Sequence, residues 1–301
     1  MDFTEQNLRT IGSIQLHNMT VEEAVEADRR VESHFHRSDG IWWREVKPFF
    51  YQPAALMRRV IPHEAAPRPW LALGGYYHIV PDGSASNGMI VVNEVTEPAA
   101  YDLEQMPKKT RYDLRRGLAQ LRINRVSNLE HLLGDGYDIY LAWERRVGNV
   151  FIKRSDPTVY RRWIVRTFHH PYSLILGAYL ENRLVAYVLV HAVDGTADLS
   201  KSFSDPLVQQ QLHVSPSSAL IFAYLRICGR NPQIRKACCG LRSHKKSLED
   251  YKQRLGFRHI AYPAFIHLRA PIRPFVRWLM PIQYQRLMGH YNPDPSSVPA
   301  T

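Results

Sequence analysis

The chain has 301 residues, of which 45% are hydrophobic and 22% are charged, so a sizeable core is available and a disordered composition is excluded. Its formal net charge of +11 favours anionic partners: nucleic acid, CoA-type phosphates or an acidic lipid surface. The first residues lack the apolar stretch of a secretory signal, and no run of about 18 apolar residues occurs. We therefore expect a cytoplasmic protein without a transmembrane segment, with association to a membrane surface left open.

Several chemical classes can be set aside from the motifs. The three cysteines, Cys228, Cys238 and Cys239, are odd in number and form no C-x-x-C pair, so we expect buried free thiols. His34 and His36 would face different sides of an expected helix, and no metal site is predicted. The sequence contains no G-x-G-x-x-G, P-loop or G-x-S-x-G motif, which argues against dinucleotide binding, Walker-type ATP hydrolysis and α/β-hydrolase chemistry.

The first half of the chain mixes helical and strand patterns. Residues 20–36 begin with a capping box and are predicted to form a helix. Residues 70–80 and 88–96 are rich in β-formers and flank a turn-rich connector, which predicts a hairpin. Residues 98–123 are predicted to be helical with a strongly basic face. That face carries Lys108, Lys109, Arg111, Arg115, Arg116 and Arg122.

The second half is more regular. Its predicted elements follow the order strand, strand, strand, helix, strand, helix, strand, over 173–180, 184–193, 197–204, 216–229, 234–241, 244–255 and 257–268. This order predicts an α/β or α+β unit with a mixed, mostly antiparallel sheet flanked by helices. A polar, Pro-rich tail ends the chain and is predicted to be disordered.

The segment 174–268 resembles the core of the GNAT acyltransferases. The hairpin GAYLENRLVAYVLVH is similar to the family's paired central strands, and SLEDYKQRLGF is similar to its last helix, often written Y-x-x-x-G-F. Ordinary members place a Gly-rich loop before the helix that faces the donor pyrophosphate, whereas residues 205–219 here contain no glycine. They also often carry a catalytic Tyr four residues before the position of Gly256, where this chain has Lys252 preceded by Tyr251.

These departures make the chain similar to the FemA/FemB/FemX peptidyltransferases and their "acetyltransferase 6" relatives, which lack the glycine loop and show a Lys before the terminal F/L-G. Those proteins also carry a basic helix near mid-chain, as residues 108–118 do here. The resemblance implies tandem GNAT-like halves. It implies a degenerate first copy over 1–160 and an acyltransferase core over 161–270, followed by an amphipathic segment and tail over 271–301.

Acyl transfer passes through a tetrahedral oxyanion, so a GNAT-like site must position two substrates and stabilise that charge. We expect a backbone N–H on the strand 184–193 to polarise the carbonyl. Lys252 is the first catalytic candidate, as a cation near the leaving group or donor phosphate, with Tyr251 beside it; an exposed helix lysine is the alternative. His191 and His213 are candidate bases because the reference pKa of histidine lies near neutrality, and structural histidines are the alternative.

Two groups of residues are candidates for binding the donor. The serines at the start of the helix 216–229 could bind donor phosphates or could only cap the helix. The arginines of the basic helix could bind donor phosphates or tRNA, or could form a solvent-exposed face. The donor candidates are Ser215, Ser217 and Ser218 at the start of the helix 216–229, and Arg111, Arg115 and Arg116 on the basic helix.

The third strand of the second half supplies candidates for the acceptor cleft, namely Lys201, Ser202 and Ser204. Strict alternation predicts two faces for this strand. One face would carry Asp198, Ser200, Ser202 and Ser204, and the other would carry Ala197, Leu199, Lys201 and Phe203. A solvated polar face is the alternative to an acceptor cleft.

The sequence therefore predicts an N-acyltransferase or aminoacyltransferase that moves an acyl group from an anionic activated donor to an amine. Acyl-CoA, aminoacyl-tRNA and a carrier-protein thioester are all anionic, so charge does not separate them, and no permanently bound cofactor is expected. The alternative is a non-catalytic GNAT-like module that binds RNA or another anionic partner through its basic helix. The segment 271–289 could contact a membrane surface or pack on the core.

Overall fold

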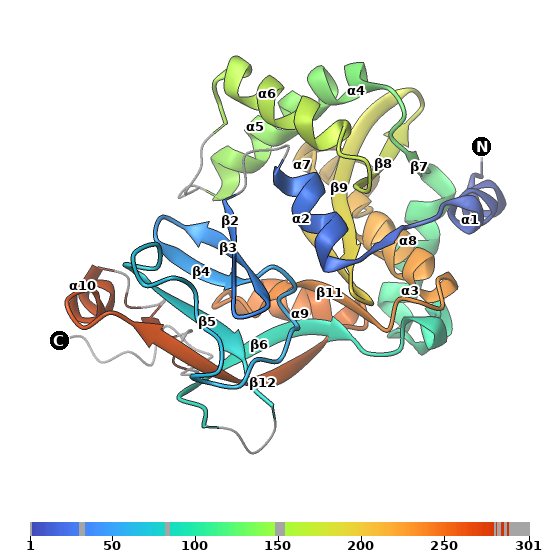
Figure 1. Ribbon diagram of the computed structural model, residues 1–301. Coiled ribbons are helices and arrows are strands. Elements are labelled where there is room, and N and C mark those ends of the chain that lie inside the picture. Colours follow the sequence, from blue (N-terminus) through green and yellow to red (C-terminus); the bar gives the residue numbers. More distant parts are fainter. Residues whose placement is uncertain are drawn as a thin grey trace. The chain divides into compact units, whose positions relative to one another are not determined.

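A computed structural model describes residues 2–29, 34–81, 85–147 and 154–279, together with positions 281, 284, 285 and 288. The chain divides into two compact units, each built from separate stretches of sequence (Figure 1). Unit 1 comprises the first 18 residues, Val95–Cys239 and Gln253–Phe257; unit 2 comprises Met19–Glu94, Gly240–Lys252 and the chain from Arg258 onward. Each unit contains a mostly antiparallel sheet with helices, as the predicted fold class requires.

The elements of unit 1 are α1 (Thr4–Ser13), η1 (Pro98–Ala100), η2 (Leu103–Gln105), α3 (Lys108–Gln120), β7 (Arg122–Arg125), α4 (Leu129–Leu133), α5 (Asp135–Val147), α6 (Pro157–Phe168), β8 (Leu174–Leu180), β9 (Arg183–Val193), β10 (Thr196–Ser204), α7 (Pro206–Leu212), α8 (Pro216–Arg230) and β11 (Lys236–Leu241). Those of unit 2 are α2 (Val21–Arg29), β2 (Phe35–Ser38), β3 (Ile41–Lys47), β4 (Phe50–Pro53), β5 (Gly75–Ile79), β6 (Gly88–Val95), α9 (Lys246–Arg254), β12 (Arg258–Leu268) and α10 (Ile272–Leu279). A two-residue strand, β1 (Asn18–Met19), lies at the boundary, and β11, α9 and β6 extend across it. The order of elements predicted for the second half is confirmed, with the short α7 added before α8.

The sheet of unit 1 runs in the order β7-β8-β9-β10-β11 and is antiparallel except for the pair β10–β11. On one of its faces, Tyr187 and Phe203 from the strands pack against Tyr140 of α5 and Tyr160 of α6. All four rings are fully buried. Burying a large apolar side chain contributes roughly 1.5–3 kcal/mol, so this cluster is a main source of stability for β9 and β10.

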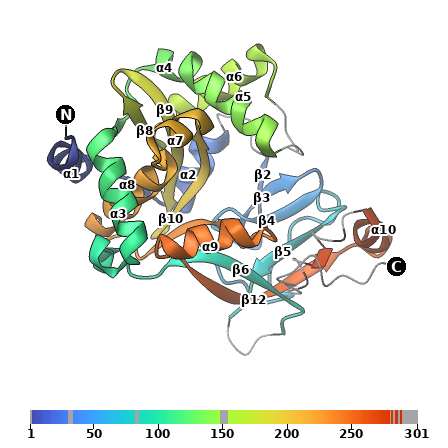
Figure 2. The same cartoon turned by 180° about the vertical axis from the view of Figure 1, so that it is seen from behind.

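The other face is covered by α8, which is apolar nearly all round and packs against the strands and against α1 and α3 (Figure 2). Ser215 caps α8 by accepting a hydrogen bond from the backbone N–H of Ser218 at 3.2 Å, and Pro216 occupies the first helical position. Gly229 allows the helix to approach η1 closely, since a Cβ there would lie 2.2 Å from the carbonyl oxygen of Pro98. The start of α8 is thus fixed by local sequence, whereas Gly229 near its end allows close packing against a segment far away in the chain.

Asn7 of α1 joins three segments of unit 1 through its amide. The side chain is 0% exposed. Its Nδ2 donates to the carbonyl oxygens of Leu118 and Leu121 at 2.7 Å each, where α3 ends, and its Oδ1 accepts from the backbone N–H of Ile123 at 2.7 Å, where β7 begins. One buried side chain therefore satisfies backbone groups on both sides of the α3–β7 connection.

Replacing Asn7 with Ala should lower the free energy of unfolding by roughly 2–4 kcal/mol, because it leaves buried backbone donors and acceptors unpaired. Gln6→Ala, one position earlier and exposed, is the matched control and should change stability by less than about 0.5 kcal/mol. Urea unfolding followed by circular dichroism measures both. Equal effects of the two substitutions would show that the Asn7 hydrogen bonds do not stabilise the fold.

The sheet of unit 2 runs in the order β2-β3-β4-β5-β12-β6 and is antiparallel except for the pair β4–β5. A two-residue turn at Asp39-Gly40, with φ values of 51° and 73°, joins β2 to β3. Asp-Gly is a preferred pair for such a type I′ hairpin. The predicted helix 20–36 is therefore wrong at its end, because α2 ends at Arg29 and Phe35 begins a strand, with 30–33 outside the described residues.

The predicted hairpin of strands 70–80 and 88–96 is also wrong, because β12 lies between β5 and β6. The second half of β12 pairs with β5 and its first half pairs with β6. Asn87 holds this crossing, since its amide donates to the carbonyl oxygen of Ile266 at 2.8 Å and accepts from the N–H of Ile266 at 2.7 Å. The partner strand is almost 180 residues away in sequence, so local turn signals could not reveal it.

The predicted helix over 98–123 is shorter than expected. Pro98–Ala100 and Leu103–Gln105 form separate 3-10 turns, and α3 begins only after Pro107. Proline lacks a backbone N–H and disfavours helical geometry in the residue before it, so a helix cannot pass through position 107 without a break.

The remaining structural expectations concern the thiols and the C-terminal tail. Cys228 and Cys238 are buried free thiols as predicted, and Cys239 is partly exposed. Burial raises the pKa of the Cys228 thiol, which keeps it protonated. The predicted disorder of the Pro-rich tail falls on residues outside the described part. Within the described part, no helix is both long enough and apolar enough to cross a bilayer.

Candidate functional site

Strands β10 and β11 are hydrogen-bonded neighbours only where they begin. Their parallel register joins Thr196–Asp198 to Lys236–Cys238 and ends there, although β10 continues to Ser204. The other edge of β10 stays paired with β9 along its whole length. From Leu199 onward, one edge of β10 therefore pairs with no strand in the described part of the chain.

A β-bulge in β10 follows immediately after the last residue paired with β11. Val190 and Leu189 of β9 face Leu199 and Lys201, so Ser200 is an extra residue in β10. The hydroxyl of Ser200 donates to the carbonyl oxygen of Leu189 at 3.2 Å. A bulge bends the strand and locally disrupts its ladder of hydrogen bonds. The backbone groups on the unpaired edge of β10 are therefore not arranged as in a regular strand at this point.

The bulge overturns the strict alternation predicted for residues 197–204. Leu199 now lies on the same face as Ser202 and Ser204, and Ser200 no longer belongs to their row. Lys201 lies on the opposite face with Phe203, where the aromatic cluster packs. Of the three predicted acceptor residues, Ser202 and Ser204 thus share one face, while Lys201 lies on the other.

The serines at the start of α8 meet the face of β10 that carries Ser202. The hydroxyl oxygens of Ser202 and Ser217 are 3.4 Å apart. Ser215 is the helix cap, and Ser218 is buried. The structure therefore brings the predicted acceptor residue Ser202 together with the predicted donor residue Ser217, and Ser204 is buried farther along the same strand.

The three candidate arginines of α3 have different partners. Arg111 and Arg115 both form ion pairs with Glu104 of η2, an acid that lies outside α3. Arg116 instead donates a hydrogen bond to the carbonyl oxygen of Leu212 at 3.0 Å, in the turn that leads into α8. Arg116 is therefore the member of this group that lies beside the start of α8.

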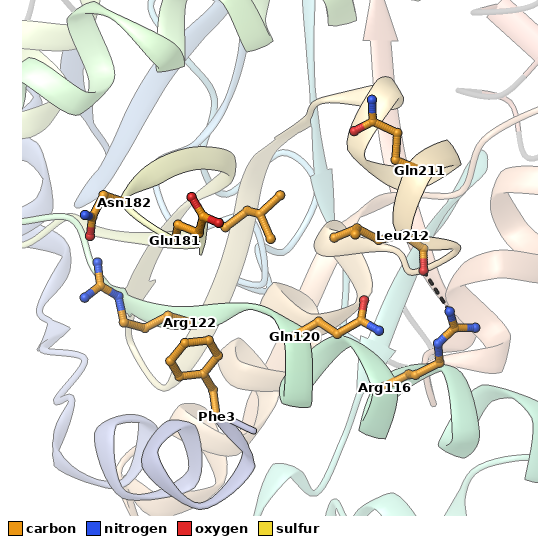
Figure 3. Close-up of a pocket in the computed structure, with 9 residues that line it drawn as sticks. Phe3, Arg116, Gln120, Arg122, Glu181, Asn182, Gln211 and Leu212 are labelled. Atoms are coloured by element: carbon orange, nitrogen blue, oxygen red, sulfur yellow. Dashed lines mark hydrogen bonds between the residues drawn. The ribbon is translucent and has the colours of Figure 1, made fainter. Parts of the chain in front are cut away.

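A hollow of about 660 Å³ lies on unit 1 next to Arg116 (Figure 3). Its lining consists of Phe3, Arg116, Gln120, Arg122, Leu180, Glu181, Asn182, Gln211 and Leu212. Two polar atoms of the lining residues, Nε of Arg122 and Oε1 of Gln120, are buried and have no hydrogen-bond partner in the part of the chain that the structure describes. The lining has two guanidinium groups against one carboxylate, so its charge favours an anion.

The two candidate histidines lie at different ends of the strands. His191 Nε2 is 4.0 Å from Asp198 Oδ2, at the end where β10 and β11 are paired. His191 lies three positions along β9 from Val188, the residue opposite Ser202, which corresponds to about 10 Å. His213 ends α7 with φ 52° and an exposed side chain, just before the α8 cap. Its position suits the site around α8 better than that of His191 does.

A second polar cluster lies in unit 2 around the carboxylate of Glu249, which is 4% exposed. The carboxylate accepts from the backbone N–H of Ser243 at 2.9 Å, lies 2.7 Å from Nε2 of His259 and lies 3.4 Å from Nζ of Lys252. Lys252 is only 7% exposed, so it is not an ordinary surface lysine. A lysine this deeply buried requires a charged or strongly polar partner, and Glu249 supplies it.

Asn93 adds an unsatisfied amide next to this cluster. It is fully buried and faces His259 across the β6–β12 pair, and neither its Oδ1 nor its Nδ2 has a hydrogen-bond partner among the described residues. Buried polar groups in native proteins are almost always satisfied, by protein, by water or by a ligand. Tyr251, the other candidate on α9, is only partly buried.

Sequence reasoning singled out Lys252 but missed Glu249, His259 and Asn93. The spacing of Glu249 and Lys252, three residues apart in a predicted helix, was an available signal. The contacts of His259 and Asn93 were not visible, because they depend on β12 pairing with β6. Among the described residues, no group of three or more His, Cys, Asp or Glu side chains is arranged to hold a metal ion.

No protein-family profile matches the chain, and no curated protein matches it in sequence. Solved structures do match it. The crystal structure of FemX superposes with a TM-score of 0.55 at 9% identity, covering 92% of this chain and 98% of FemX. The chain has a GNAT/Fem-like fold. The resemblance suggested by the last helix and the missing glycine loop is thus confirmed at the level of the fold.

Two further structures with this fold span nearly the whole chain. The C-terminal domain of a lysylphosphatidylglycerol synthetase from Agrobacterium fabrum has a TM-score of 0.50 and 11% identity, covering 96% of this chain and 97% of that domain. A conserved protein of unknown function from Bacteroides thetaiotaomicron has a TM-score of 0.51 and 9% identity, covering 89% and 99%. At such identities the likeness concerns the fold, and the chemistry must be argued from the residues.

Substituting Lys252 with Met should lower the free energy of unfolding by about 1–3 kcal/mol, because a methionine keeps the length of the side chain but leaves the buried Glu249 without its cation. Lys246→Met on the same helix is the matched control, since Lys246 forms an exposed pair with Asp250 and should contribute little. Chemical unfolding of the two variants measures the difference. A Lys252→Met protein as stable as the control would mean that the buried pair does not stabilise unit 2.

Proposed function

We propose that this protein transfers an acyl or aminoacyl group from an anionic activated donor to an amine. The donor classes are acyl-CoA, aminoacyl-tRNA and a carrier-protein thioester. The observation that carries the proposal is the early end of the β10–β11 pairing, followed directly by a bulge at Ser200 and by a capped helix, α8, whose first turn meets Ser202. The GNAT/Fem-like fold supports the same reading.

The start of α8 suits the phosphate-bearing part of a donor. The positive end of a helix dipole favours anions without requiring the glycines that the sequence lacks, although Pro216 has no backbone N–H and the N–H of Ser218 donates to Ser215. Ser217 adds a hydroxyl at this point, and Arg116 adds a guanidinium in the preceding turn. The basic hollow beside Arg116 offers room for further anionic parts of the donor.

The oxyanion of the tetrahedral intermediate would be stabilised by backbone N–H groups near the bulge. The sequence predicts this role for the strand 184–193, but β9 is paired along both edges with β8 and β10, so its N–H groups are engaged in the sheet. The edge of β10 beyond Asp198 is the better position, because β11 no longer pairs with it there. Donors fixed before the reaction stabilise developing charge most effectively.

In the reaction, the amine nitrogen attacks the acyl carbonyl carbon and forms a C–N bond, while the C–S or C–O bond to the donor breaks. The proton lost by the amine goes to the released thiol or hydroxyl group, directly or through a base. Lys252, the first catalytic candidate from the sequence, pairs with Glu249 within unit 2, and its role in the reaction stays a prediction. His213 is the proposed base, since its position before the α8 cap suits proton transfer better than that of His191.

A non-catalytic module that binds RNA through α3 is less well supported. Arg111 and Arg115 are engaged with Glu104, which reduces the positive charge that the helix offers to a nucleic acid. Arg116 points to the turn before α8 rather than extending a basic surface along the helix. The arrangement thus favours a donor site over a phosphate-backbone site.

Thermal unfolding in the presence of CoA, acetyl-CoA, long-chain acyl-CoA and charged tRNA identifies the donor class. A ligand present at 100 times its Kd that binds only the folded protein stabilises it by about 2.7 kcal/mol, which raises the melting temperature. We expect a shift with one donor class and, with that donor and an amine, amide formation. A shift with tRNA alone and no product would support the RNA-binding module instead. No shift with any of them leaves a carrier-protein donor, tested with an acylated carrier protein.

Arg116→Gln should weaken binding of the active donor by roughly tenfold or more, because it removes a charged hydrogen-bond donor beside the phosphate site. Arg115→Gln, on the neighbouring residue that pairs with Glu104, should leave the affinity within about twofold. Isothermal titration of both variants gives the comparison. Equal losses would assign the effect to overall charge and would argue against a donor site at the start of α8.

A further inference from the structure

The C-terminal helix α10 presents large apolar side chains to solvent. Phe275, Trp278 and Leu279 are 59%, 78% and 51% exposed. Their spacing of three and four residues places them on one side of the helix. Grouped, exposed apolar side chains of this size usually mark a surface that contacts a partner or a membrane.

The charge around α10 is of one sign. From Arg269 to Met288 the sequence contains four arginines and no aspartate or glutamate. Arg273 and Arg277 lie one turn apart on α10, away from the side that carries Phe275 and Leu279, and neither forms an ion pair within the described part of the chain. The segment therefore combines an exposed aromatic side with uncompensated positive charge.

The two arginines also line a hollow. Arg273 and Arg277 border a space of about 440 Å³ together with Pro281, Tyr284, Gln285 and Met288. Nε of Arg273 lies 3.3 Å from the hydroxyl of Tyr284, which holds the guanidinium at the edge of this space. Guanidinium groups, a phenol and a carboxamide together form a donor-rich lining that suits a phosphate group.

We propose that α10 and this hollow dock the protein on the surface of an anionic phospholipid bilayer. Trp278 and Phe275 enter the boundary between headgroups and acyl chains, where aromatic rings are favoured, and Arg273 and Arg277 bind headgroup phosphates. A twofold contact with a second copy is disfavoured, because it would place the same uncompensated arginines against each other. This docking site is independent of the proposed transfer reaction.

The test uses the full-length protein with large vesicles of phosphatidylcholine alone and of phosphatidylcholine containing a quarter phosphatidylglycerol. We expect cosedimentation with the anionic vesicles at low salt and little with the neutral ones. Arg273→Gln/Arg277→Gln should lower partitioning roughly 30-fold, as expected for two arginines at an anionic surface. Phe275→Ser/Trp278→Ser should lower it by at least tenfold, because the rings supply the apolar part of binding.

Two matched variants control for total charge and for loss of an exposed ring. Arg145→Gln/Arg146→Gln on α5 removes the same charge from an exposed site in unit 1, and Tyr112→Ser removes a ring that is 63% exposed on α3. Both should bind like the original protein. Equal losses in the two double-arginine variants, or no binding to anionic vesicles at low salt, would overturn the docking site.

A third outcome would also overturn it. If the protein forms dimers that Phe275→Ser/Trp278→Ser dissociates while vesicle binding is absent, the helix face is a contact between copies. Analytical ultracentrifugation of the same proteins detects this. The thermal shift with the acyl donor should be unchanged in all α10 variants, so failure of membrane docking and failure of the transferase proposal can be told apart.

Discussion

Strand β10 is held by different partners along its two edges, and the proposed site follows from that constraint. The aromatic cluster around Tyr187 and Phe203 fixes β10 to β9, while Tyr224 of α8 donates to the carbonyl oxygen of Cys238 at 3.0 Å and fixes the last paired residue of β11. Burial raises the pKa of Tyr224, so its phenol remains a donor. Each strand is thus anchored by its own buried contacts, and packing, rather than local strand propensity, determines where their pairing ends.

The excess positive charge of the chain is used unevenly. On α3, an acid from a neighbouring 3-10 turn engages two arginines and leaves Arg116 at the turn before α8. On α10, no acid is close in sequence, and the arginines line a hollow of their own. The net charge of +11 therefore includes basic residues that are paired with acids and, in the described part of the chain, basic residues that are not. The positions of the few nearby acids decide which basic residues can bind an anion.

Buried polar groups in unit 2 are retained at an energetic cost. Removing Glu249 and Lys252 from water is unfavourable, and the attraction between them offsets that cost only because His259 and the N–H of Ser243 satisfy the carboxylate as well. The side chain of Asn93, buried beside His259, has no hydrogen-bond partner within the described ranges and so lacks even that compensation. Replacing a buried ion pair by apolar residues of similar volume is often neutral or stabilising, so stability alone does not account for the cluster.

The sequence by itself determined the order of elements in the second half, the cap and start of α8 and the absence of the glycine loop, because each depends on residues within one turn or strand of one another. Only the tertiary structure decided that β12 separates β5 from β6, that Ser200 bulges, that Arg116 rather than Arg115 reaches the turn before α8, and that Lys252 is buried. These features arise from partners many residues away. Local patterns record propensity and face, whereas pairing and burial depend on which distant segment supplies the matching hydrogen bonds and apolar surface.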